Sequence, residues 1–235
     1  FNFSRIRQNA VCIIGLVHHL KCSEPQGKLI KKMASFIEKR FLEHQHGLIC
    51  NSNTTSMTCV ELAKKRIPTC IAKPGTISSI EQISESEIRR RASSVVPLRI
   101  LFLGTVTPRK GLHHLLQALA GVNEPMHLSI VGSTSRDANY AQTCRQNASA
   151  LQEHTIEFMN EVSQTVLLTQ MGQSDILAVP SDYEGYGIAY LEGFSAGLPC
   201  MATAHGAPPE FVTDGENGFL IEPGDTARLT SQLEA

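Results

Sequence analysis

The chain has 235 residues, of which 42% are apolar and 18% charged, with a net charge of −1 at pH 7. These values are ordinary for one large or two small globular domains. A nearly neutral chain exerts no general attraction on nucleic acid, and its basic and aromatic residues are not interleaved as they are where bases stack, so nucleic acid is excluded as an expected partner.

The first part of the chain, residues 1–75, alternates strand and helix patterns. Apolar runs predict strands at residues 10–17 and 47–51, and apolar residues at helical spacing predict helices at 27–43 and 54–65. We interpret this part as the end of an α/β domain. Because the chain starts without methionine and ends inside a helix opened by Asp225, we expect a fragment cut at both ends.

Residues 76–97 are polar and rich in serine, glutamate and arginine, and we interpret them as an interdomain linker. A second α/β series follows at residues 98–235. Strict alternation of strands and helices predicts a parallel sheet covered on both faces, with ligands bound at the carboxyl ends of its strands. The expected strands are residues 99–104, 127–132, 155–159, 175–179 and 199–203, and the expected helices include 112–120 and 137–151.

Two glutamates, Glu184 and Glu192, frame a glycine-flanked helix start. Gly185 and Gly187 allow the backbone to approach a ligand, and the free N–H groups near Ile188 form an anion site. Glu192 lies four residues after Ile188, so we expect both on the inward face of the helix, where the carboxylate can accept hydrogen bonds from sugar hydroxyls. Alternatively, these carboxylates only stabilise the helix dipole, by about 0.3–1 kcal/mol.

The loop of residues 104–111 places Arg109 and Lys110 directly before the helix expected from Leu112. Two cations and a helix N-terminus suit a diphosphate. A basic pair at a loop tip is often merely solvated, but this loop is expected at the same sheet edge as the glutamate segment, which favours phosphate binding.

Two adjacent histidines, His18 and His19, end the strand expected at 10–17. A histidine can donate to a developing charge or orient a hydroxyl near neutral pH, and a purely structural role is an equal alternative. Only one of the two can share the strand's outward face.

Residues 27–42 form a basic amphipathic helix with two interpretations. It could contact an anionic membrane surface. More often such a helix packs on its own sheet with its lysines in water, and we favour this. Its expected apolar side carries Leu29, Ile30, Met33, Phe36 and Ile37.

Seven scattered cysteines form no C-x-x-C pair, which indicates a reducing, cytoplasmic compartment, with contact at the inner membrane face through residues 27–42 as an addition. The sequence has no D-x-D, H-E-x-x-H or P-loop motif, so no metal site is expected.

The motifs in their order resemble those of GT-B glycosyltransferases of the GT4 type: Arg109, Lys110 and Gly111, then Glu184 and Glu192, then Pro209 and Glu210 with residues 214–218. The resemblance implies an α/β, GT-B-like fold, with two Rossmann-like domains facing a cleft, the first incomplete and the second nearly complete. It also implies transfer of a sugar from a nucleotide-sugar to an acceptor hydroxyl with retention of configuration, with neither metal nor other cofactor. The acceptor, a glycan, lipid or small molecule, stays open.

The resemblance also implies roles for individual residues. Glu184 would contact the donor sugar, Glu192 the ribose, and His18 would lie beside the reacting sugar. Many members have arginine directly after the loop glycine, where this chain has Thr105, and Arg109 is the residue that would compensate. The candidate catalytic residues are His18, Glu184, Arg109 and Lys110. The candidate donor-binding residues are Gly104, Thr105, Arg109, Lys110, Gly185, Tyr186, Gly187, Ile188 and Glu192.

Two other classes of function stay open. One is a sugar-nucleotide binding module without activity, and the other is a GT-B phosphorylase or epimerase. The family's acceptor-side loop is missing from this chain, so donor binding without transfer is also an open outcome.

Overall fold

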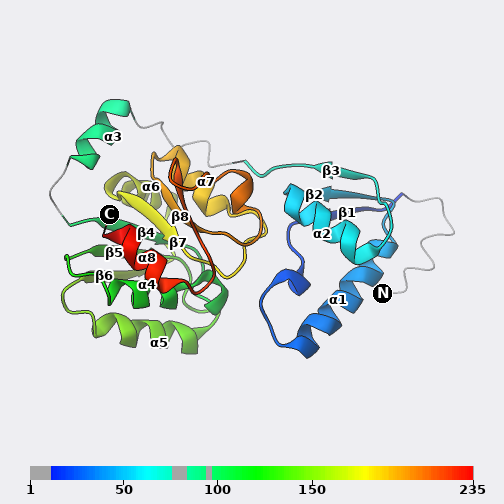
Figure 1. Ribbon diagram of the computed structural model, residues 1–235, viewed down its shortest axis with the longest axis horizontal. Helices are drawn as coiled ribbons and strands as arrows, with labels where there is room; N and C mark the ends of the chain where they lie inside the picture. The colour runs from blue at the N-terminus through cyan, green and yellow to red at the C-terminus, as the bar shows by residue number, and fades with distance from the viewer. Residues whose placement is uncertain (1–11, 76–83, 94–96, 235) are drawn as a thin grey trace. The chain divides into compact units, whose positions relative to one another are not determined.

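The computed structural model describes residues 12–75, 84–93 and 97–234, which divide into two compact units (Figure 1). One unit comprises Phe1–Pro74 with Glu184–Tyr186, and the other Gly75–Tyr183 with Gly187–Ala235. Among the described residues, no helix combines the length and the apolar run needed to cross a bilayer.

The first unit contains a three-stranded parallel sheet in the order β1-β2-β3. The strands and helices expected here are confirmed, although β1 is shorter than predicted, and residues 10–11 of that prediction lie outside the described residues. The sequence pattern missed β3, because three residues are too few to show a period. The elements are β1 (Ile14–Val17), α1 (Lys28–Glu43), β2 (Gly47–Cys50), α2 (Asn53–Ala63) and β3 (Thr69–Ile71).

Helix α1 does not pack as we expected. Its buried side contains Leu42, with Ala34 partly buried against the core, and Glu38 accepts a hydrogen bond from the Cys22 N–H at 3.1 Å. The opposite side, with the five apolar residues of the predicted face, is exposed. The interpretation that this apolar face packs on the sheet of the chain is therefore wrong.

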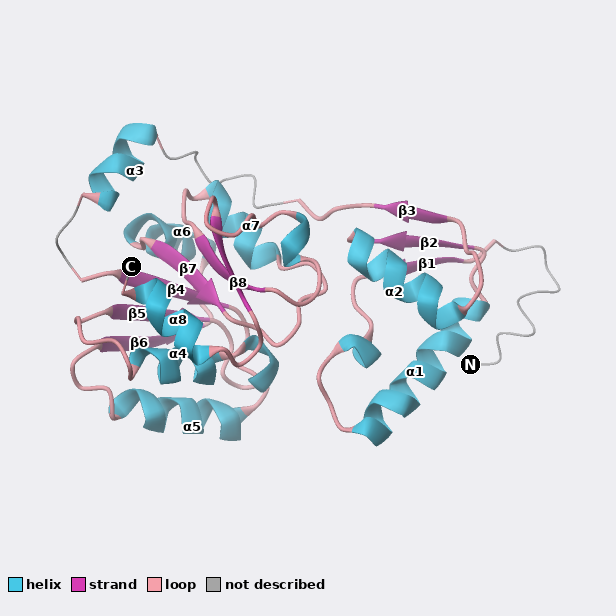
Figure 2. Ribbon diagram, in the orientation of Figure 1, coloured by secondary structure: helices cyan, strands magenta, loops and turns pink. Residues whose placement is uncertain are grey.

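The second unit contains a six-stranded, entirely parallel sheet in the order β6-β5-β4-β7-β8-β9. Helices α4, α5 and α8 gather on one side of this sheet, and α6 and α7 on the other (Figure 2). Its strands are β4 (Arg99–Leu103), β5 (His127–Val131), β6 (Thr155–Asn160), β7 (Ile176–Val179), β8 (Cys200–Thr203) and β9 (Gly218–Ile221). Its helices are α3 (Glu85–Ala92), α4 (Leu112–Leu119), α5 (Ala138–Ser149), α6 (Gln164–Gln173), α7 (Ile188–Ser195) and α8 (Thr226–Leu233).

The central strands are continuous apolar runs, because helices cover both faces of the sheet. Every residue of β7 and of β8 is buried. The five strands predicted for this part are confirmed, whereas β9 was not predicted. Residues Pro208–Glu210 form only a single 3-10 turn.

The polar segment 76–97 contains a helix that the sequence analysis did not predict. Ser84 accepts a hydrogen bond from the Glu87 N–H and caps α3, and the Arg91 guanidinium donates to the Ser174 carbonyl at 3.2 Å. Residues 76–83 and 94–96 of the expected linker lie outside the described residues.

The order of the strands creates a switch point in the second sheet. From β4 the chain proceeds outward to β5 and β6, and it then returns to β7, on the other side of β4. At such a point the loops that follow the two central strands diverge and leave a crevice, where ligands bind in open α/β sheets. In this chain those loops are residues 104–111 and 180–187.

Candidate functional site

The two loops at the switch point are hydrogen-bonded to each other. Arg109 Nη1 donates to the Tyr183 carbonyl at 2.7 Å, and the Asp182 N–H donates to the Arg109 carbonyl at 2.8 Å. The expectation that the basic loop and the glutamate segment share a sheet edge is thus confirmed. These contacts hold Arg109 beside the residue that precedes Glu184.

Glycine makes this close approach of the loops possible. Gly111 has a φ of +72°, and a Cβ at this position would lie 1.9 Å from the Pro180 carbonyl oxygen. At the start of the same loop, a Cβ at Gly104 would lie 3.3 Å from Cε of Lys110. The lysine side chain therefore extends along Gly104 at the carboxyl end of β4.

The N-terminus of α7 follows the second loop. Gly187, with a φ of +96°, is its N-cap, and no described side chain makes a capping hydrogen bond. The Tyr190 hydroxyl donates to the Val179 carbonyl at 2.6 Å, which ties the start of the helix to the end of β7. The first N–H groups of α7 thus form the kind of site that binds an anion.

The two glutamates have different surroundings. Glu184 is buried, with 6% of its surface exposed. Glu192 is half-buried, and burial raises the pKa of its carboxyl. Ionisation of this carboxyl therefore costs free energy in the protein without ligand, which is consistent with a carboxylate that accepts hydrogen bonds from a bound ligand.

The face of α7 that packs inward differs from the predicted one. Tyr190 and Gly193 are buried, and a Cβ at Gly193 would lie 2.9 Å from Cδ2 of Leu177, whereas Ile188 is 45% exposed. The expectation that Ile188 and Glu192 share the inward face is therefore wrong. At residue 193 the helix lies so close to β7 that only glycine fits, and this close contact determines which face of α7 is buried.

His18 and His19 follow β1 rather than end it, because the strand stops at Val17. The His18 carbonyl accepts a hydrogen bond from the Asn51 side chain at 2.7 Å, and its own side chain is exposed. His19 Nε2 lies 2.9 Å from Glu24 Oε1. His18 is therefore the more accessible imidazole of the pair, and its catalytic role stays a prediction.

The sequence analysis missed a polar group at the start of α4. His114 Nε2 lies 3.5 Å from Asp182 Oδ1, and His113 Nδ1 lies 2.7 Å from the Tyr140 hydroxyl. Burial, and secondarily the neighbouring His114, lower the pKa of His113. Two histidines directly after a basic loop at a strand end were the available signal.

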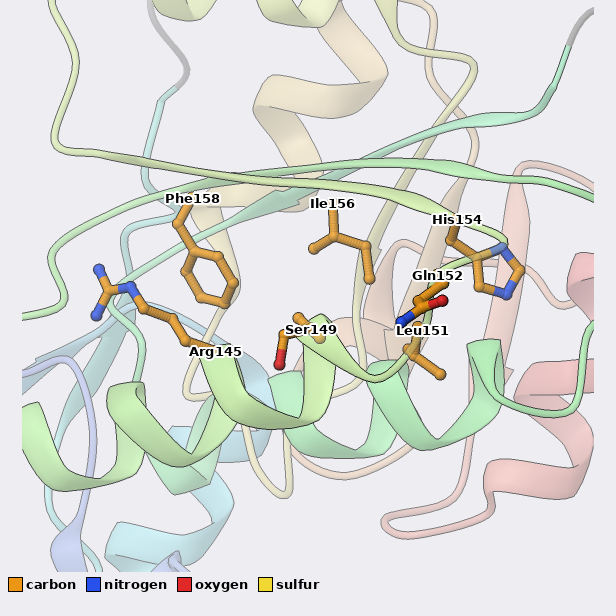
Figure 3. Close-up of a pocket in the computed structure, with 8 residues that line it drawn as sticks. Arg145, Ser149, Leu151, Gln152, His154, Ile156 and Phe158 are labelled. Atoms are coloured by element: carbon orange, nitrogen blue, oxygen red, sulfur yellow. The ribbon is translucent and has the colours of Figure 1, made fainter.

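A separate pocket of about 290 Å³ lies between α5 and β6, and it contains none of the predicted site residues (Figure 3). The Arg145 guanidinium lies 5.0 Å from the centre of the Phe158 ring. His154 Nδ1 accepts from the Met126 N–H at 3.1 Å, and Nε2 lies 2.9 Å from the Leu119 carbonyl oxygen. The pocket's histidine is thus engaged in holding the fold together, and we assign the pocket no function.

Residues 84–235 match the family described as "Glycosyl transferases group 1". This is more than half of the chain, so the chain belongs to that family. Among similar proteins, the phosphatidyl-myo-inositol mannosyltransferase of Mycobacterium leprae is 36% identical over 141 residues, which cover 58% of this chain and 36% of the relative. The D-inositol 3-phosphate glycosyltransferase of Corynebacterium efficiens is 30% identical over 154 residues, covering 62% and 36%. The matched part of the chain thus spans about a third of the length of each of these two relatives.

Solved structures show the same fold. HepE from Anabaena, in complex with UDP and glucose, matches with a TM-score of 0.79 and 20% identity over 95% of this chain and 61% of that one. Sucrose-phosphate synthase from Thermosynechococcus elongatus matches with a TM-score of 0.78 and 21% identity over 97% and 59%. The expected GT-B type of α/β fold, with parallel sheets in both units, is confirmed over the part of these proteins that the chain covers.

Proposed function

We propose that the protein transfers a sugar from a nucleotide-sugar to an acceptor hydroxyl, with retention of anomeric configuration and with neither metal nor other cofactor. One observation carries the proposal: at the switch point, hydrogen bonds join the loop of Arg109 and Lys110 to the loop that leads into the uncapped N-terminus of α7. Family membership supports it.

These groups supply positive charge where a diphosphate would lie. Arg109 and Lys110 carry full charges, and the first N–H groups of α7 add the positive end of the helix dipole. As the bond between the sugar and the diphosphate breaks, negative charge develops on the leaving diphosphate. A well-placed hydrogen-bond donor to such an anion lowers the activation free energy by about 3–4 kcal/mol. These groups would therefore stabilise the leaving diphosphate as a metal ion does in other enzymes.

In the transfer, the bond between the anomeric carbon and the β-phosphate oxygen breaks, and the acceptor oxygen bonds to the same carbon. The acceptor's proton leaves with the diphosphate. Glu184 would accept hydrogen bonds from the donor sugar, and Glu192 from the ribose. Binding to the ribose would give the costly Glu192 carboxylate the donors that it lacks. His18 would orient the reacting sugar.

The names of similar proteins narrow the donor and the acceptor. Two relatives are described as GDP-mannose-dependent, and a solved structure of HepE holds UDP-glucose. Relatives are also named for phosphatidylinositol and inositol phosphate acceptors. We propose that the donor is a UDP- or GDP-sugar, and that the acceptor carries an inositol-like polyol, either free or as a lipid headgroup.

Calorimetric titration with UDP, GDP and ADP and their sugar conjugates tests the donor site. Lys110→Ala is expected to weaken binding about 10- to 100-fold, the value of a hydrogen bond to a charged group. Arg66→Ala, which removes an exposed cation from the first unit, is the matched control. Equal weakening by both variants, or no binding by a folded sample, would show that the donor site is assigned wrongly.

Product analysis then tests the reaction. NMR of the product made in the presence of EDTA is expected to show the anomeric configuration of the donor. Inversion, or dependence on a divalent ion, would contradict the proposal. Binding without turnover would identify a sugar-nucleotide binding module, and turnover without an acceptor a phosphorylase or epimerase.

A further inference from the structure

The polar group at the start of α4 has no role among the donor contacts proposed above. Its members are His113, His114, Tyr140 and Asp182, which come from α4, from α5 and from the loop after β7. All four side chains are half-buried, so water and salt screen their interactions less than at an exposed position. Contacts within this group can therefore influence the geometry of the neighbouring loops.

His114 lies beside three loops at the carboxyl ends of the strands. A Cβ at Gly111, in the loop after β4, would lie 3.4 Å from Cδ2 of the His114 ring. A Cβ at Gly224, in the loop after β9, would lie 3.7 Å from its Cε1. Its Nε2 lies 3.5 Å from Oδ1 of Asp182, in the loop after β7. One imidazole thus adjoins the basic loop and the loop that precedes Glu184.

Tyr140 and His113 hold the His114 ring in this place. The Tyr140 hydroxyl accepts a hydrogen bond from the His113 N–H at 3.1 Å and lies 2.7 Å from His113 Nδ1. Because burial, and secondarily His114, lower the pKa of His113, this imidazole carries no charge at neutral pH. Its ring packs against that of His114, with 3.8 Å between the ring centres. A neutral ring that tyrosine fixes in place therefore supports His114 beside Asp182.

Asp182 connects this group to the two loops of the donor site. Its N–H donates to the Arg109 carbonyl at 2.8 Å, and the Arg109 guanidinium donates to the carbonyl of the next residue, Tyr183, at 2.7 Å. The side chain beside His114 thus belongs to the same short segment that makes both bonds. Displacement of Asp182 would break its bond to Arg109 and move the residue that precedes Glu184.

We propose that His114 is a positioning residue: by holding the Asp182 carboxylate, it keeps residues 180–183 against the basic loop, in the arrangement that binds the donor diphosphate. A hydrogen bond to a charged acceptor is stronger than one between neutral groups. An imidazole N–H facing Asp182 also offsets the negative charge of this carboxylate beside a site for a diphosphate, where like charges repel. The inference rests on the proposed function, because it concerns the same donor site.

Titration of the protein with UDP, GDP and ADP, each alone, tests the proposal. His114→Ala is expected to weaken binding of the nucleotide that the wild type prefers by about three- to tenfold, the value of one hydrogen bond. His114→Gln, whose amide can donate to Asp182, is expected to restore most of the affinity. The matched control is His127→Ala, since His127 is half-buried in the same unit but begins β5 at the opposite edge of the sheet. Circular dichroism confirms that each variant folds.

A double-mutant cycle separates positioning from direct contact with the nucleotide. In the Asp182→Ala protein, His114→Ala should have little further effect on affinity, because the partner of the histidine is already gone. An undiminished effect in that background would show that His114 contacts the nucleotide itself, and it would overturn the proposal.

Amide exchange of the protein without ligand distinguishes failure of this inference from failure of the proposed function. The bond to the Arg109 carbonyl protects the Asp182 amide, so His114→Ala should accelerate its exchange, whereas His127→Ala should not. Equal exchange rates in the two variants would refute the positioning role. Absence of nucleotide binding by the folded wild type would refute the proposed function, and the exchange of the Asp182 amide would still decide whether His114 holds the loop.

Discussion

Replacing Gly111 by alanine perturbs the contact between the two loops of the donor site. The residue has a φ of +72°, and the left-handed region costs a non-glycine residue about 1–2 kcal/mol. The new Cβ would also lie 1.9 Å from the Pro180 carbonyl oxygen, so the loop and the end of β7 must separate by about 1 Å to reach even a tight contact. Overpacking of this kind costs about 1–3 kcal/mol more. The expected loss of stability is about 2–5 kcal/mol.

Gly215→Ala is the matched control. This glycine lies in the same unit and has a φ of +80°, but no atom lies within 4 Å of its would-be Cβ. The control should lose only the backbone cost of about 1–2 kcal/mol. Urea unfolding followed by circular dichroism measures the free energy of unfolding of both variants.

The separation of the loops should also affect binding. Displacement of residues 104–111 breaks the hydrogen bond from Arg109 to Tyr183, so nucleotide affinity should fall for Gly111→Ala and stay unchanged for Gly215→Ala. If Gly111→Ala is no less stable than the control and binds nucleotide equally well, the described packing of the loop against β7 is refuted.

Two further predictions concern charged side chains. Burial raises the pKa of Glu192 above its ordinary 4.5, so the folded protein loses stability as the pH rises from about 4.5 through the raised pKa. Glu192→Gln should therefore raise the urea midpoint at neutral pH, have little effect below pH 4.5, and weaken nucleotide binding. An unchanged urea midpoint at neutral pH would contradict the conclusion that burial raises the pKa of Glu192. Asp175 lies 2.8 Å from Arg99 Nη2 and also accepts the Arg99 N–H, so Asp175→Ala should cost about 1–3 kcal/mol in urea unfolding. Glu85→Ala, which removes the exposed partner of Arg89, should have little effect, and equal losses would show that the Asp175 pair has no special weight.

Local pattern was enough to predict the elements around the donor site. The apolar run before Pro180 and the glycines at 185 and 187 predicted strand, loop and helix, because burial and backbone freedom are properties of a few neighbouring residues. Asp225 was predicted in the same way to begin α8, and its carboxylate accepts a hydrogen bond from the Arg228 N–H at 2.9 Å.

Hydrophobic periodicity predicted the wrong buried side in two helices, α1 and α7. In α1 the more apolar side is exposed, and a side with Ala34 and Glu38 faces the unit. In α7 the packed face depends on Tyr190 and on the absence of a side chain at Gly193. Periodicity ranks the two sides by hydrophobicity only, whereas shape and hydrogen bonding to the neighbouring element decide between them.

The sequence by itself determined the alternation of strands and helices, the glycine-flanked start of α7 and the basic loop with Arg109 and Lys110, since each depends on residues close together in the chain. Only the tertiary structure decided that β4 lies beside β7, that Arg109 bonds to Tyr183 and that His114 approaches Asp182. The pairing of β4 with β7 joins strands that residues 104–175 separate in the chain, and the free energy that selects among possible strand orders is spread over the whole core rather than located in any one segment.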